Sequence, residues 1–126
     1  MKNTLILVFA FVTLGFTMNA QKYVAGIEDK SAIDHESGVY EFLVNASEIS
    51  AEDVKKAANY YTDYFSVKQK EEDGVRVIMV YLDTPGDEMS INVIMRLLVT
   101  LKIDKVDYVG SEMELHPFWS EYMNKK

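Results

Sequence analysis

The 126-residue chain contains no cysteine. Disulfide bonds, thiolate nucleophiles and Cys-ligated zinc or iron–sulfur centres are therefore excluded. Gly-rich phosphate loops and Ser-centred nucleophile motifs are also lacking. Neighbouring carboxylates such as Glu52 and Asp53 fit the start of a helix better than an acid–base pair. We expect a fold held together by packing alone and a protein that is not an enzyme.

Basic residues are in deficit. The chain has 13 Lys and Arg against 20 Asp and Glu, which gives a formal net charge of −7. A surface of this sign repels phosphate backbones. We therefore expect no nucleic-acid partner.

A hydrophobic run long enough to cross a membrane is missing from the N-terminal segment. The apolar run Leu5–Phe16 has about a dozen residues, whereas a membrane-spanning helix needs roughly 20. With Lys2 before it and Ala20 after it, this run predicts an export signal over residues 1–20, cleaved near Ala20/Gln21. The run resembles the signals of soluble proteins exported by Gram-negative bacteria, and no cysteine follows it to carry a lipid. We expect a periplasmic or secreted protein without a stable membrane anchor.

The remaining chain has the length of a single domain. Residues 21–38 carry many charges and show no sustained hydrophobic period, which predicts an N-terminal arm with at most a short strand. Residues 39–126 predict one folded domain, with a C-terminal tail from about residue 111.

Local patterns predict the elements of this domain. Alternating apolar residues over Val39–Val44 are typical of a half-buried strand. Ser50 and Asp53 form a capping-box pattern that begins a helix, and the turn residues 71–74 close a hairpin. Further strands are predicted at Phe65–Lys70, Val75–Leu82 and Lys105–Val109, and a second helix at Ser90–Lys102.

Aromatic residues have two interpretations. Tyr60, Tyr61 and Tyr64 on the first helix are interpreted as packing and surface residues, with an aromatic ligand platform as the alternative. The second helix has only a narrow polar stripe, so another part of the chain must cover it. The tail residues with amphipathic spacing are predicted to provide this cover: Phe118, Trp119, Tyr122 and Met123.

The order of elements predicts an α+β fold, a ferredoxin-like βαββαβ sandwich with an antiparallel sheet, two helices on one face and a short C-terminal aromatic tail. Val39–Val44 and Val75–Leu82 take the central positions. The second face of such a sheet is often open, so Leu43 and one side of the third strand are expected to form an apolar patch. We expect a homodimer through this face.

Over roughly Tyr40–Val109, the strand, capped helix, hairpin, Ser-initiated helix and final strand resemble the heavy-metal-associated domain family of copper chaperones. That family holds Cu(I) with a Cys-x-x-Cys loop between its first strand and first helix. The corresponding stretch here, residues 45–50, reads Asn-Ala-Ser-Glu-Ile-Ser. Without soft thiolates the usual Cu(I) site cannot form. The resemblance therefore implies the scaffold and not the metal-transfer activity.

The chain is also similar to the inhibitory propeptides of subtilisin-like proteases, which are small, exported and ferredoxin-like. These propeptides end in a strand and an extended tail that enters the protease cleft. Residues 106–109, followed by Glu112 and His116, are similar to that ending. This resemblance implies a stand-alone protease inhibitor, which is one alternative function.

A metal site without cysteine is a second alternative. Met113 and His116 provide thioether and imidazole donors, the types used for copper in oxidising compartments. Glu112 and Glu114 lie nearby, and His35 is the only other histidine. The interpretation preferred here is a solvated or packing role for these residues and no cofactor, with copper binding by Met113 and His116 as the alternative.

Together these patterns predict an exported, non-enzymatic binding module on a heavy-metal-associated-like scaffold. Its partner is an unknown protein or small ligand, bound through the open sheet face or the aromatic tail.

Overall fold

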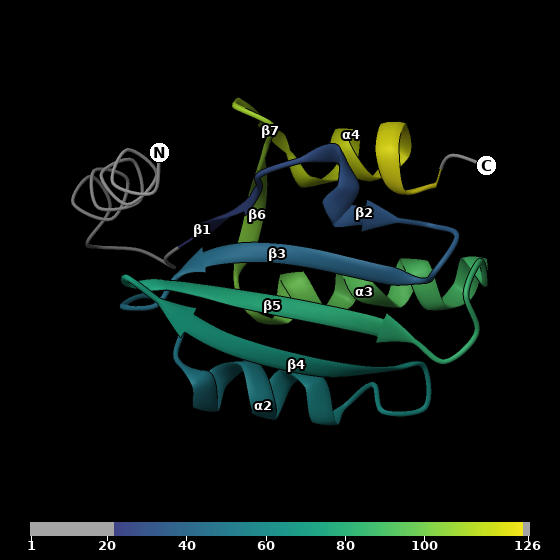
Figure 1. Cartoon of the computed structure of the whole chain (residues 1–126), viewed down its shortest axis with the longest axis horizontal. Coiled ribbons are helices and arrows are strands. Elements are labelled where there is room, and N and C mark those ends of the chain that lie inside the picture. Colours follow the sequence, from purple (N-terminus) through teal and green to yellow (C-terminus); the bar gives the residue numbers. More distant parts are fainter. Residues whose placement is uncertain (1–21, 125–126) are drawn as a thin grey trace.

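The computed structural model describes residues 22–124, so the predicted export signal at residues 1–20 lies outside the described residues. Within that range the chain forms one open, mixed sheet of seven strands together with three α-helices (Figure 1). This confirms the predicted α+β class.

The bounds of the elements follow the sequence patterns to within a few residues from residue 39 onward. The strands are β1 (Tyr23–Ile27), β2 (Ile33–Asp34), β3 (Val39–Asn45), β4 (Phe65–Glu72), β5 (Val75–Leu82), β6 (Ile103–Tyr108) and β7 (Ser111–Glu114). The helices are α2 (Ala51–Asn59), α3 (Glu88–Thr100) and α4 (Leu115–Phe118), with a 3₁₀ turn η1 (Lys30–Ala32) and a π-helical turn η2 (Trp119–Met123). β1 and β2 both come from the segment that the sequence assigns to an N-terminal arm.

Two short sequence patterns, the helix cap and the hairpin turn, form the local structures that they predict. Ser50 caps α2, because its side chain accepts a hydrogen bond from the Asp53 backbone N–H and the Asp53 carboxylate accepts one from the Ser50 N–H. Asp73 and Gly74 connect β4 to β5 with φ angles of 53° and 82°. Two successive residues with positive φ are typical of a type I′ hairpin turn.

The sheet has the strand order β4-β5-β3-β1-β6-β7, and β2 pairs with the first residues of β3. β3 and β5 are interior strands, which confirms their predicted central positions. The expectation of a purely antiparallel sheet is wrong, because β1 and β6 pair in parallel.

The position of β1 explains this difference. In a ferredoxin-like unit the last strand pairs with the first. The corresponding strands here are β6 and β3, and β1 lies between them. Gly26 of β1 aligns with Leu43 of β3, and Ala25 aligns with Val106 of β6. Part of the segment that precedes the predicted domain, Tyr23–Ile27, therefore forms one of the interior strands of the sheet.

The two faces of the sheet differ in their cover. Tyr40, Phe42 and Val44 of β3 belong to the main core, together with the buried sides of all three helices. Leu43 points to the other face and clusters with Val75 and Val77 of β5. These three residues are at most 8% exposed, so they lie on the predicted face but present little exposed apolar surface. The homodimer through this face stays a prediction.

The C-terminal tail completes the main core. Phe118, Trp119 and Met123 are buried in the same cluster as the inner side of α3. The Tyr122 ring stacks on Tyr108 of β6, with the ring centroids 4.1 Å apart. The tail is therefore a structural part of the domain, and only Tyr122 among its aromatic residues is half-exposed.

His35 links this tail to the sheet through two hydrogen bonds. Its Nε2 donates to the Tyr122 carbonyl oxygen at 3.0 Å, and its Nδ1 lies 2.9 Å from the Tyr40 hydroxyl. Because a carbonyl only accepts, the neutral ring carries its proton on Nε2, and Nδ1 accepts from Tyr40. Burial raises the pKa of Tyr40 to about 12, which keeps this hydroxyl protonated as a donor.

We expect His35→Ala to destabilise the protein by about 1–3 kcal/mol, because the buried Tyr40 hydroxyl and the Tyr122 carbonyl lose their shared partner. Urea unfolding of the protein measures the change. The control is His116→Ala at the exposed histidine of α4. Equal unfolding free energies for the two variants would contradict a fastening role for His35.

The turn between β6 and β7 holds a strained residue. Val109 has a φ of 49° and is followed by Gly110 at 90°. A β-branched residue in this left-handed region is disfavoured, whereas Asn-Gly is the preferred pair for such a turn.

Val109→Asn is therefore expected to stabilise the protein by about 1 kcal/mol. Val109→Ile, which keeps the branched side chain, is the matched control and should show no gain. Thermal unfolding of both variants at one pH provides the measurement, and an unchanged midpoint for Val109→Asn would count against the strain.

Candidate functional site

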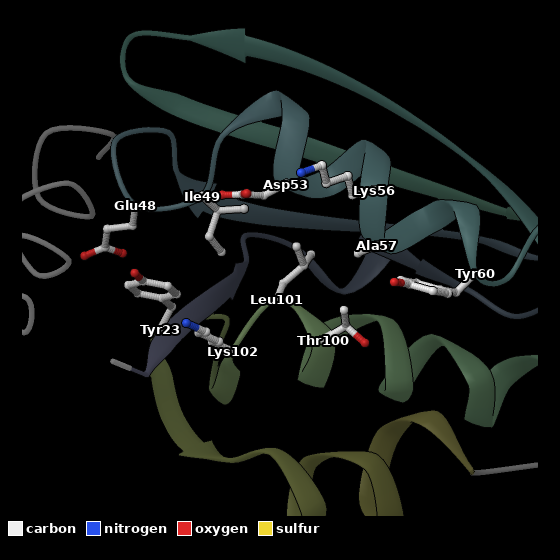
Figure 2. Close-up of a pocket in the computed structure, with 10 residues that line it drawn as sticks. All are labelled: Tyr23, Glu48, Ile49, Asp53, Lys56, Ala57, Tyr60, Thr100, Leu101 and Lys102. Carbon is white, nitrogen blue, oxygen red and sulfur yellow. The ribbon is translucent and has the colours of Figure 1, made fainter. Parts of the chain in front are cut away.

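A cleft of about 310 Å³ lies between α2 and the C-terminal end of α3 (Figure 2). One end is formed by Tyr23 and Glu48, and the other by Tyr60 and Thr100. The cleft is lined by Tyr23, Glu48, Ile49, Asp53, Lys56, Ala57, Tyr60, Thr100, Leu101 and Lys102.

The sheet topology brings these residues together. β1 runs antiparallel to β3, so Tyr23 at the start of β1 lies near the loop 46–50 that follows β3. The Tyr23 N–H donates to the Lys102 carbonyl oxygen at 2.8 Å, which joins the start of β1 to the end of α3. Lys102 itself has a φ of 66°, and this left-handed residue turns the chain from α3 directly into β6.

The loop that carries Glu48 is fixed by buried polar groups. The Asn45 side-chain oxygen accepts from the Ser47 N–H at 2.8 Å and from the Ser47 hydroxyl at 2.6 Å. Arg76 of β5, only 7% exposed, donates from Nε to the Ile49 carbonyl oxygen at 3.0 Å. These contacts hold one wall of the cleft in place before any ligand arrives.

Glu48 is the electrostatically unusual residue of the cleft. Burial raises the pKa of its carboxyl to about 7, and no hydrogen bond or ion pair to another residue of the range 22–124 opposes this. An anion removed from water without a partner is unfavourable, which is why the proton is retained. At neutral pH the carboxyl is thus divided between its neutral and ionised forms.

The pKa of Tyr23 is also shifted by the environment of the cleft. Burial raises the pKa of its phenol, and the nearby negative charges of Glu48 and Asp53 raise it further. Its hydroxyl points toward the Glu48 carboxyl group (Figure 2). Tyr23 therefore remains a neutral phenol across the physiological pH range.

The other end of the cleft is aromatic and more open. Tyr60 is 77% exposed, and its hydroxyl group points toward the interior of the cleft (Figure 2). Thr100 is held by a hydrogen bond to the Arg96 carbonyl oxygen at 2.8 Å and lies 3.1 Å from the Tyr61 hydroxyl. Of the three tyrosines considered for an aromatic platform, Tyr60 is the one that lines the cleft.

The residues predicted to bind metal lie elsewhere. Met113 on β7 is half-buried and packs against the main core, whereas His116 on α4 is exposed. Across residues 22–124, no group of three or more His, Asp or Glu side chains is arranged to hold a metal ion. Copper binding by Met113 and His116 stays a prediction, which titration with Cu(I) and Cu(II) can test.

Of the cleft residues, the sequence interpretation considered only Tyr60 as a ligand contact, and it did not select Tyr23, Glu48 or Lys102. Tyr23 and Lys102 are joined only through the pairing of β1 with β6.

No protein-family model, curated protein or solved structure matches the chain. Both family resemblances therefore remain predictions. In the described part, residues 22–124, none of the helices has the length and apolar character needed to span a bilayer.

The raised pKa of Glu48 determines how the stability of the folded protein should depend on pH. Between pH 4.5, its ordinary pKa, and about pH 7, the folded protein retains a proton that the unfolded chain has lost. Stability from this group therefore falls as the pH rises through that window. We expect Glu48→Gln to be more stable than the parent at pH 8, with the gain vanishing below pH 4.5.

Thermal unfolding of the protein at several pH values between 4 and 8 checks this expectation, in steps of about one unit. Glu36→Gln, at an exposed position, is the control and should follow the parent curve. A Glu48→Gln curve that also runs parallel to the parent would mean that Glu48 is ordinarily solvated.

Proposed function

We propose that this chain is an exported, non-enzymatic binding module and that the cleft between α2 and α3 is where it binds a small ligand. The observation that carries the proposal is the combination of an apolar floor with a half-buried carboxyl group that lacks a partner among the described residues. Small-molecule sites are typically concave and apolar, with a few placed polar groups.

The size of the cleft favours a small molecule over a protein. Its volume of about 310 Å³ falls at the lower end of ligand pockets, which span roughly 300–1,000 Å³. Ile49, Ala57 and Leu101 form the base of the cleft, where each is at most 5% exposed, and Tyr60 stands at the open end. A preformed wall reduces the entropy lost on binding.

We also infer that the scaffold is an elaborated ferredoxin-like unit. The order β3-α2-β4-β5-α3-β6 reproduces the βαββαβ sequence of that motif. β1 is then an additional strand inserted between the first and last strands of the unit, and β2 and β7 extend its edges. Metal transfer by the heavy-metal-associated family is not part of the proposal.

A matched pair of variants tests the binding site. Thr100→Trp places a large ring at the cleft, whereas Asn92→Trp places the same ring at another exposed position of α3 that does not line it. We expect a ligand-observed NMR screen of a small-molecule library to give binders for the parent and for Asn92→Trp. The same binders should be lost with Thr100→Trp.

Circular dichroism and thermal unfolding establish that both variants are folded. The proposal is contradicted if the parent binds nothing in the library. Binders that Thr100→Trp retains would contradict it as well, since they would occupy another surface.

A further inference from the structure

We propose that the ligand of the α2–α3 cleft is an organic ammonium compound with an apolar body, whose charged nitrogen pairs with Glu48. The apolar body would lie on the floor formed by Ile49, Ala57 and Leu101. This inference rests on the proposed function, because it specifies the chemical class of ligand for the same site.

The first argument is the missing counter-charge at Glu48. Its carboxyl group is half-buried and forms no ion pair or hydrogen bond with another residue of the described part. A bound ammonium group would supply a charge-assisted hydrogen bond and stabilise the ionised carboxylate. An anionic ligand cannot form this ion pair and would add a second negative charge at the Glu48 end of the cleft.

The second argument is the phenol ring beside Glu48. Figure 2 shows the Tyr23 side chain next to the Glu48 carboxyl group at the same end of the cleft. An ammonium ion near an aromatic ring gains attraction from the π electrons. The phenol stays neutral because its pKa is raised, so it adds no competing charge.

The third argument limits the number of charges on the ligand. Lys56 and Lys102 also line the cleft, on the α2 wall and after α3. Both carry a positive charge and would repel additional positive charge on the ligand. A monocation or a compact zwitterion therefore fits better than a polyamine.

The base of the cleft favours an apolar body on the ligand. Ile49, Ala57 and Leu101 lie between the Glu48 end and Tyr60, whose ring stands at the opposite end (Figure 2). An aromatic ring on a short aliphatic linker is a body that can pack on this base. The net charge of −7 adds a general attraction for cations during encounter.

The test compares three probes of nearly equal shape: 2-phenylethylamine, 2-phenylethanol and 3-phenylpropanoate. Isothermal titration or NMR titration of the processed chain at pH 8 measures their affinities. We expect the amine to bind about tenfold more tightly than the alcohol, which corresponds to one charge-assisted hydrogen bond. The anion should bind most weakly, and spermidine should bind more weakly than 2-phenylethylamine.

Variants assign the effect to the cleft. Glu48→Gln should remove the preference for the amine while leaving the alcohol nearly unchanged. Thr100→Trp should abolish binding of both, and Asn92→Trp should retain both. Tyr60→Ala should weaken both probes by a similar factor, because this ring contacts the body and not the charge.

The pH dependence provides an independent readout. The other titratable groups that line the cleft are Tyr23 from β1, Asp53 and Lys56 from α2, and Lys102 at the end of α3. Affinity for the amine should rise between pH 6 and pH 8 as Glu48 ionises about its pKa of about 7, and affinity for the alcohol should stay constant. In Glu48→Gln the amine should lose this dependence.

The outcomes separate this inference from the proposed function. Equal affinities for amine and alcohol, both lost with Thr100→Trp, would overturn the ammonium class and leave the cleft as a binding site. Preference for the anion would also overturn it. Amine binding that survives Thr100→Trp would refute both, and an amine that does not bind at pH 8 would refute the ammonium class outright.

Discussion

The pairing of β1 with both β3 and β6 is the constraint on which the rest of the structure depends. Because β1 lies between β3 and β6, these two strands do not pair with each other. The backbone N–H of Tyr23 donates a hydrogen bond to the Lys102 carbonyl oxygen, and the start of β1 lies at one end of the α2–α3 cleft. The same strand that changes the topology therefore supplies one end of the candidate site.

The cleft owes its shape to buried polar groups that form hydrogen bonds, and its electrostatic character to the half-buried carboxyl group of Glu48. Asn45 and Arg76 hold the loop 46–50 through hydrogen bonds to Ser47 and to the Ile49 carbonyl. Glu48, in the same loop, loses water contact without gaining a partner in the described chain. A rigid loop that holds a half-buried carboxyl group without a partner among the described residues favours a ligand that brings the opposite charge.

The sequence predicted the parts of the fold that depend on local chemistry. The Ser50 capping box, the Asp73-Gly74 turn and the burial of Trp119 follow from short patterns that the structure confirms. The pairing of β1 could not be predicted, because five residues that include Gly26 show no distinctive period and their partner in β6 is distant in the chain. The role of Glu48 was equally hidden, since the burial of a single carboxylate is set by tertiary contacts.

The central claim is that the cleft at the start of β1 is a ligand site for an ammonium compound. Intermolecular nuclear Overhauser effects between 2-phenylethylamine and the isotope-labelled processed chain test it most directly. The account predicts contacts from the methylene group next to nitrogen to the Tyr23 ring and from the phenyl ring to the Leu101 methyl groups. Contacts to Val77 and Met79 on the opposite face of the sheet, with none to Leu101, would contradict it.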